Sequence, residues 1–124
     1  MIRKPTLVLF GALLVAGCSP GREAQTVTNS GEIPIGVFGA QTGPEAAFGT
    51  SSANGVRLAA EEINAAGGVL GRKIRLVVED DQGRADEAAS VVTKLITSDN
   101  VIALVGENSS NQSLAAAPIA QTYG

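Results

Sequence analysis

Two short runs of the chain, IPIGVFGA at 33–40 and VIALV at 101–105, are almost wholly apolar, and stretches with helical spacing lie between them. Apolar runs of this length that are rich in β-branched residues predict strands. A strand that is apolar at every position is buried on both faces, which is typical of a parallel sheet covered by helices. The alternation therefore predicts an α/β fold.

The remaining pattern completes three strand–helix units. The segment RKIRLVVED at 72–80 alternates apolar and polar residues, which predicts a strand with one wetter face at a sheet edge. Helices are predicted from the apolar spacing of Ala53, Val56, Ala60 and Ile63, from DEAASVVTKLITS at 86–98, and from QSLAAAPIAQTYG at 112–124, kinked at Pro118. These elements predict a three-layer parallel sheet with right-handed crossovers and strand order 2-1-3.

The N-terminus has the pattern of an export signal. Arg3 and Lys4 precede an apolar stretch at 6–16 that is too short to span a bilayer comfortably. The box Val-Ala-Gly-Cys that ends at Cys18 resembles the lipobox of bacterial lipoproteins, although an ordinary signal peptide with a chance cysteine gives a similar pattern. We expect a leader at 1–17, lipidation of Cys18, and a polar, flexible tether at 18–31.

Composition excludes several kinds of function. The 124 residues allow one small domain and contain no histidine, which rules out histidine metal ligands and Ser-His or Cys-His catalysis. The net charge is −3 and no basic patch stands out, so nucleic acid is not an expected partner. The glycines at 36, 39 and 43 do not match a dinucleotide fingerprint, and we expect neither a cofactor nor an enzyme. Asp80 and Asp81 are either a cation site or, as we expect, a solvated turn.

Ligands of open parallel sheets bind at the carboxyl ends of the strands, where strand order reverses. Two loops flank that point in the predicted fold, GAQTGPEAAFG at 39–49 and GENSSNQ at 106–112. Ser109 and Ser110 precede a helix whose free N–H groups attract anions, so they predict a carboxylate or phosphate cradle. The alternative is a simple helix cap at Ser110 or Asn111. Phe48 is either a pocket wall or a plug over the helix.

From about Ile33 to Gly124 the chain resembles the periplasmic leucine/isoleucine/valine-binding proteins, the type I substrate-binding proteins of branched-chain amino acid ABC transporters. The marks are TGP at 42–44, NG at 54–55, INAAGGVLGRKI at 63–74 and EDD at 79–81. The resemblance implies a two-lobed, monomeric protein outside the cytoplasm that captures an amino acid or similar small carboxylate for ABC permease subunits. Residues 32–124 would form part of its N-terminal lobe.

The resemblance also implies roles for single residues. Ser110 matches the serine that holds the ligand α-carboxylate, with Ser109 beside it, and Phe48 matches an aromatic wall position. Asn108 stands where leucine-binding members carry an apolar residue, so the resemblance does not fix branched-chain specificity, and this position admits polar as well as apolar ligand side chains. Some members join two cysteines that match Gly83 and Ser109, and this chain has neither.

The resemblance implies more than twice this length, so we expect an N-terminal fragment whose 124 residues bind no amino acid measurably. A receptor ectodomain or amide-binding regulator with the same fold is the alternative function. A receiver-like signalling domain fails because the acidic pair follows the second strand.

Overall fold

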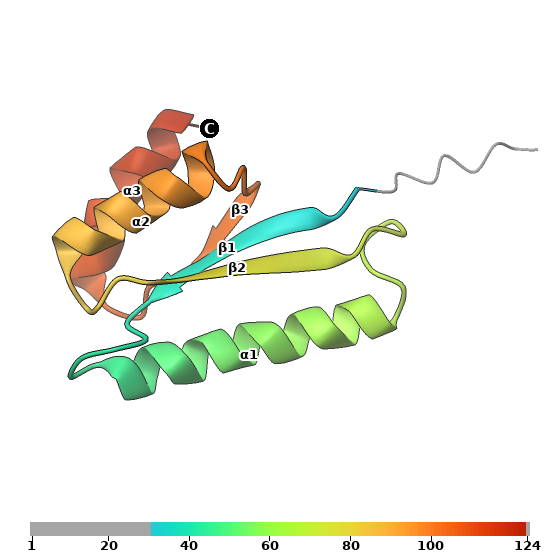
Figure 1. Ribbon diagram of the computed structural model, residues 1–124, viewed down its shortest axis with the longest axis horizontal. Helices are drawn as coiled ribbons and strands as arrows, with labels where there is room; N and C mark the ends of the chain where they lie inside the picture. The colour runs from blue at the N-terminus through green and yellow to red at the C-terminus, as the bar shows by residue number, and fades with distance from the viewer. Residues whose placement is uncertain (1–30, 124) are drawn as a thin grey trace, which may run out of the picture.

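The computed structural model describes residues 31–123, which form one parallel sheet covered on both faces by helices (Figure 1). The strand order is β2-β1-β3, as the apolar runs predict. In chain order the elements are β1 (Ile33–Gly39), α1 (Ala46–Ala65), β2 (Ile74–Asp80), α2 (Ala85–Thr97), β3 (Ala103–Val105) and α3 (Ser110–Tyr123). The predicted leader, Cys18 and the tether up to residue 30 lie outside the described residues.

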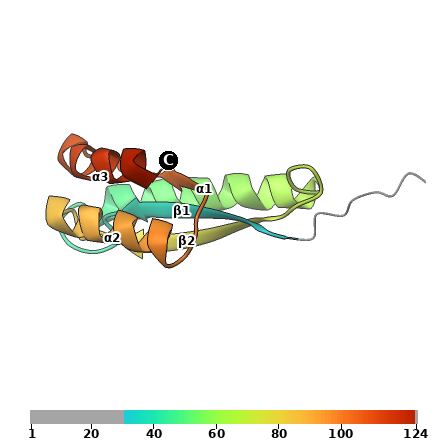
Figure 2. The same ribbon diagram turned by 90° about the horizontal axis from the view of Figure 1, so that it is seen from above.

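The helices divide between the two faces of the sheet. Helix α1 packs along β1 and β2, whereas α2 and α3 pack side by side on the opposite face (Figures 1 and 2). The core lies under α2, where Val92 and Leu95 are fully buried against Phe38 of β1 and Ala116 of α3. Burial of these apolar side chains holds the sheet and the helix pair together.

Helix α1 begins at Ala46, well before the first apolar residue of its predicted stripe, so the predicted loop at 39–49 is shorter than expected. The backbone turns at Gly43, and the first helical N–H groups bond to Gly43 and Glu45 carbonyls. Gly49 permits the helix to approach the end of β1, because a Cβ there would lie 1.9 Å from the carbonyl oxygen of Ala40. Phe48 therefore stands on a helix, not in a loop.

Strand β3 is shorter and more exposed than VIALV predicts. It pairs with β1 over three residues, Ala103 to Val105, and Ile102 beside it is 69% exposed. Within residues 31–123 no strand pairs with the outer edge of β3. Ala103 and Val105 are exposed, whereas Leu104 is half-buried and packs against the core under α2. The prediction of burial on both faces was wrong for this strand.

Strand β2 is the other edge of the sheet, as expected, and pairs with β1 over seven residues from Ile33↔Ile74 to Gly39↔Asp80. Helix α3 contains Pro118 and continues to Tyr123. Among the described residues, no helix combines the length and apolar character that a membrane span requires.

Candidate functional site

The loops after β1 and β3 meet around an open cavity of about 460 Å³ at the carboxyl end of the sheet. Four of the residues that line it are the predicted ligand-binding residues, Phe48, Asn108, Ser109 and Ser110. The fifth, Glu45, was not predicted from the sequence. The cavity lies between β1 and β3, at the point where strand order reverses. This is the place where open parallel sheets bind ligands.

Helix α3 opens toward the cavity with Ser109 and Ser110. The carbonyl of Ser109 accepts the N–H of Ser113 at 3.0 Å, so Ser109 occupies the cap position and Ser110 is the first helical residue. The Ser110 hydroxyl makes no hydrogen bond within residues 31–123. It therefore does not cap the helix, which was the alternative role predicted for Ser110. That hydroxyl and the first N–H groups of α3 are available to an anion in the cavity.

Glu107 holds this loop against the end of β1. One carboxylate oxygen accepts the N–H of Ser109 at 2.5 Å, and the other accepts the N–H of Ala40 at 3.4 Å. Its own carbonyl accepts the hydroxyl of Ser113 at 3.0 Å. The sequence did not predict a partner for Glu107, because its contact with Ala40 is visible only once the loops after β1 and β3 are placed side by side.

Gly106 is required just before this loop. Its φ is +149°, and a Cβ there would lie 2.2 Å from the carbonyl oxygen of Phe38. A residue with a side chain would push the loop away from β1 and open the cavity further.

Phe48 projects from the first turn of α1 and is 66% exposed while lining the cavity. A ring this exposed contributes little to the core, since the buried cluster lies on the other face of the sheet. Its ring leaves apolar surface exposed at the cavity, and its role as a pocket wall or a plug stays a prediction.

Asp80 ties the loop after β1 to the end of β2. Its carboxylate accepts the N–H groups of Gln41 and Gln82 at 2.7 and 2.8 Å and the Thr42 hydroxyl at 2.6 Å. Desolvation is the largest influence and acts to raise its pKa, yet the hydrogen bonds, led by that from Thr42, together hold the pKa of Asp80 below its ordinary value. The loop that carries Glu45 to the cavity is thereby fixed.

Asp81 is fully buried, which corrects the expectation of a solvated turn. Its Oδ1 accepts the N–H of Gly83 at 2.9 Å, and Gly83 in turn accepts the side-chain amide of buried Gln112. Burial raises the pKa of Asp81, and the carboxylates of Glu107, Asp80 and Glu45 add to that rise. In the described part of the chain, no group of three or more acidic or cysteine side chains is placed to hold a metal ion.

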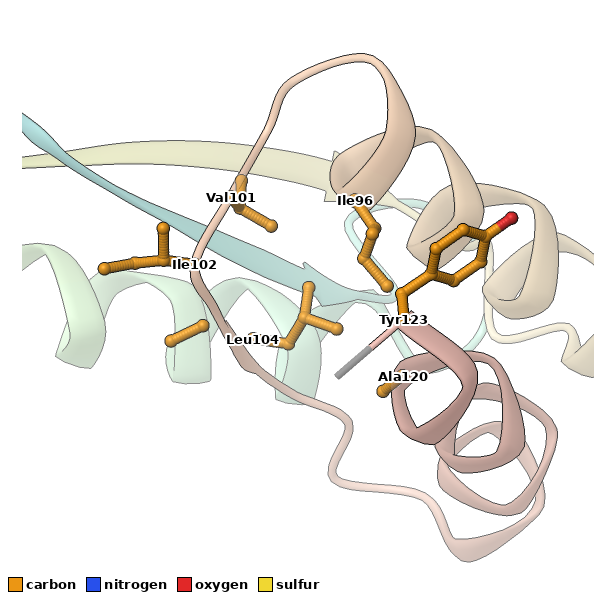
Figure 3. A pocket seen from close by; sticks show the side chains of 7 residues that line it. Ile96, Val101, Ile102, Leu104, Ala120 and Tyr123 are labelled. Carbon is orange, nitrogen blue, oxygen red and sulfur yellow. The ribbon is translucent and has the colours of Figure 1, made fainter.

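A second cavity, of about 400 Å³, lies beside the exposed edge of β3, away from these residues (Figure 3). Ile96, Leu104 and Tyr123 turn toward it from α2, β3 and α3 (Figure 3). Its mostly apolar lining has none of the polar groups that the first cavity presents.

The arrangement matches known proteins over nearly the whole described region. The profile of a family described as "Periplasmic binding protein" matches residues 32–124. The chain belongs to the periplasmic binding protein family. Together with the relatives and the solved structure described next, the match confirms the predicted kinship with leucine/isoleucine/valine-binding proteins.

Individual relatives show which members of the family this periplasmic binding protein resembles. An "Amino acid binding protein" of Pseudomonas aeruginosa is 40% identical over 93 residues, covering 75% of this chain and 25% of the relative. A "Leu/Ile/Val-binding protein homolog 7" of Brucella melitensis is 34% identical over 123 residues, covering 99% of this chain and 29% of the relative. The chain thus spans between a quarter and a third of the length of these relatives.

A solved structure shares the geometry as well. The substrate-binding protein LivJ of a Streptococcus pneumoniae branched-chain amino acid transporter, crystallised with isoleucine, superposes with a TM-score of 0.73 at 41% identity. The superposition covers 74% of this chain and 26% of LivJ. The βα units described above therefore have the same arrangement in this periplasmic binding protein and in LivJ.

Proposed function

We propose that this chain supplies one wall of the ligand site in a substrate-binding component of an ABC importer, which captures an amino acid or related small carboxylate. The observation that carries the proposal is the cavity at the carboxyl ends of β1 and β3, where a free Ser110 hydroxyl opens helix α3 opposite Phe48. A ligand carboxylate would accept hydrogen bonds from that hydroxyl and from the helix N–H groups.

Relatives support the ligand class. Proteins named for amino acid or leucine/isoleucine/valine binding are 30–40% identical to this chain, and LivJ was solved with isoleucine. In the proposal the other wall comes from a second lobe, and the complete protein works as a monomer. It acts outside the cytoplasm, delivers ligand to permease subunits and performs no catalytic step.

The test is isothermal titration of the protein made from the complete reading frame with a panel of amino acids and small carboxylates. Saturable binding of at least one α-amino acid, weakened by loss of the Ser110 hydroxyl, supports the proposal. Binding of none of the panel overturns it. Saturable binding of an aliphatic amide in place of every amino acid would favour the amide-binding regulator.

We further propose that lipid on Cys18 anchors the protein to the membrane. The support is the order of positive n-region, short apolar stretch and small-residue box before the cysteine. Metabolic labelling with a radioactive fatty acid tests it, with Cys18→Ser as the control. Label in the wild type but not in the variant supports the anchor, and unlabelled wild type processed to mature size overturns it.

A further inference from the structure

The two ends of the described lobe differ in charge. Four carboxylates lie at the carboxyl end of the strands, namely Glu45, Asp80, Asp81 and Glu107, and Glu45 is the one among them that lines the cavity. Arg84 lies at the same end and is paired with Asp86. Three basic side chains, Arg72, Lys73 and Arg75, lie at the amino end of β2. The cavity is therefore at the negative end, and its lining contains no lysine or arginine.

Three of these carboxylates are engaged within the fold. Asp80 accepts the donors of the loop after β1, Asp81 is buried against Gly83, and Glu107 bridges the two walls of the cavity. Each of them has a structural role that would be lost if a ligand took its hydrogen bonds.

Glu45 is different. Glu45 is one of the residues that line the cavity, and its carboxylate lies beside Gly83 of the β2–α2 loop. Within residues 31–123 that carboxylate has neither a hydrogen-bond donor nor a cation within bonding distance. The basic side chains on the neighbouring helices have other partners. Arg57 of α1 donates to Asn54, Arg84 pairs with Asp86, and Lys94 pairs with Glu79 and Asp99. A ligand in the cavity meets an unneutralised negative charge.

Asn108 adds a second polar group to the same lining, and its side-chain amide makes no hydrogen bond within residues 31–123. An aliphatic ligand side chain would desolvate both groups without replacing their bonds to water, which costs binding energy. An ammonium or guanidinium group would bond to the carboxylate and gain from the charge of this end of the lobe.

We propose that Glu45 is a specificity-determining residue that selects ligands with a cationic side group, an ammonium or guanidinium, over aliphatic ligands of the same length. This inference rests on the proposed function, because it names the ligand class of the same cavity. Phe48 covers the apolar stem of such a ligand, and Glu45 with Asn108 meets its polar end.

L-Lysine and L-norleucine give a sharp comparison, since they share an unbranched four-carbon stem and differ by the terminal ammonium. Both are titrated into the protein made from the complete reading frame, in the wild type and in Glu45→Gln. We expect the wild type to bind lysine more tightly, and the Glu45→Gln variant to lose about fivefold of that preference, as for a partly exposed charge pair. Glu45→Asp keeps the charge and should retain most of the preference.

Glu61→Gln is the matched control, because Glu61 is exposed near the other end of α1 and does not line the cavity. It should leave the lysine-to-norleucine ratio unchanged. A wild type that prefers norleucine or leucine to lysine overturns the inference and leaves the proposed function standing, as does an unchanged ratio in Glu45→Gln. Absence of binding by every amino acid and every small carboxylate of the panel overturns the proposed function itself.

Discussion

Glu107 and Ala40 lie 67 residues apart in the chain, yet the carboxylate of Glu107 accepts the backbone N–H of Ala40. Its other oxygen accepts the N–H of Ser109 at the start of α3. One side chain therefore connects the two walls of the cavity, and the position of the Ser110 hydroxyl depends on that connection.

Glu107→Ala should loosen this connection. We expect the amide hydrogens of Ala40 and Ser109 to exchange markedly faster with solvent, because each loses its acceptor, while those of the β1–β2 ladder change little. Hydrogen exchange followed by NMR measures this. Glu61→Ala, at an exposed carboxylate on α1, is the control, and equal protection of Ala40 in both variants would contradict the role of Glu107.

Gly49→Ala should destabilise the protein by about 3 kcal/mol or more, because the added Cβ overlaps the backbone of Ala40 and nothing flexible can move aside. Gly55→Ala is the matched control on the same helix, since no atom lies within 4 Å of its added Cβ. That variant should be stabilised by about 0.5–1 kcal/mol through helix propensity. Urea denaturation of both variants measures the difference, and similar midpoints would refute the close approach.

Ser110→Ala should weaken ligand binding about 10- to 100-fold, the range for losing a hydrogen bond to a charged group of about 1.5–3 kcal/mol. Thermal stability should change little, because the hydroxyl makes no hydrogen bond within residues 31–123. Ser52→Ala, at an exposed position of α1, is the control in the same titration. If Ser110→Ala binds the ligand with unaltered affinity, the hydroxyl does not bond to the ligand.

Asp80 and Asp81 should respond to pH in opposite directions. The folded pKa of Asp80 lies below its ordinary value of 3.8, so its stabilisation is present above that pH and is lost as pH falls through the lower folded pKa. The destabilisation by Asp80→Asn should therefore be largest near pH 7 and shrink in acid.

The folded pKa of Asp81 is raised, so its stabilisation is full below 3.8 and is lost as pH rises through the higher folded pKa. The cost of Asp81→Asn should accordingly be largest in acid and decline toward neutral pH. Melting temperatures of both variants and the wild type from pH 3 to 7 measure the two slopes. If the loss of melting temperature changed with pH in the same direction in both variants, the opposite pKa shifts of Asp80 and Asp81 would be contradicted.

Ile102→Lys should suppress self-association of the chain from residue 31 onward. Ile102 is exposed beside the outer edge of β3, where an unpaired apolar edge favours pairing with other molecules and a lysine opposes it. Leu70→Lys, at a side chain that is 95% exposed and away from that edge, is the control. Analytical ultracentrifugation over a concentration series measures the effect, and equal association of both variants would exclude the edge as its cause.

The strand order could be predicted from the sequence. The run at 72–80 alternates polar and apolar residues and suits a sheet edge, whereas the apolar runs at 33–40 and 101–105 were expected to be neighbours. The same order brought Phe48, Asn108, Ser109 and Ser110 together by the rule that ligands bind where strand order reverses. Local patterns and one topological rule predicted this much.

What escaped prediction depends on contacts between distant segments. The start of α1 was missed because Glu45, at the cap position, is not a favoured capping residue and makes no side-chain capping bond. Gly49, a poor helix former, is there because a side chain would overlap Ala40. The burial of Asp81 follows from the packing around Gly83 and Gln112. Spacing along the chain does not encode these approaches.

The unequal lengths of the two strand pairings give the site a place in the order of folding. The β1–β2 ladder spans seven residues and closes a compact β-α-β unit, whereas β1 and β3 share three. The cavity requires the shorter pairing, which joins residues farther apart in the chain than the β1–β2 ladder does, so we expect it to form after that ladder. On that expectation most of the described scaffold forms before Ser109 and Ser110 reach their places at the cavity.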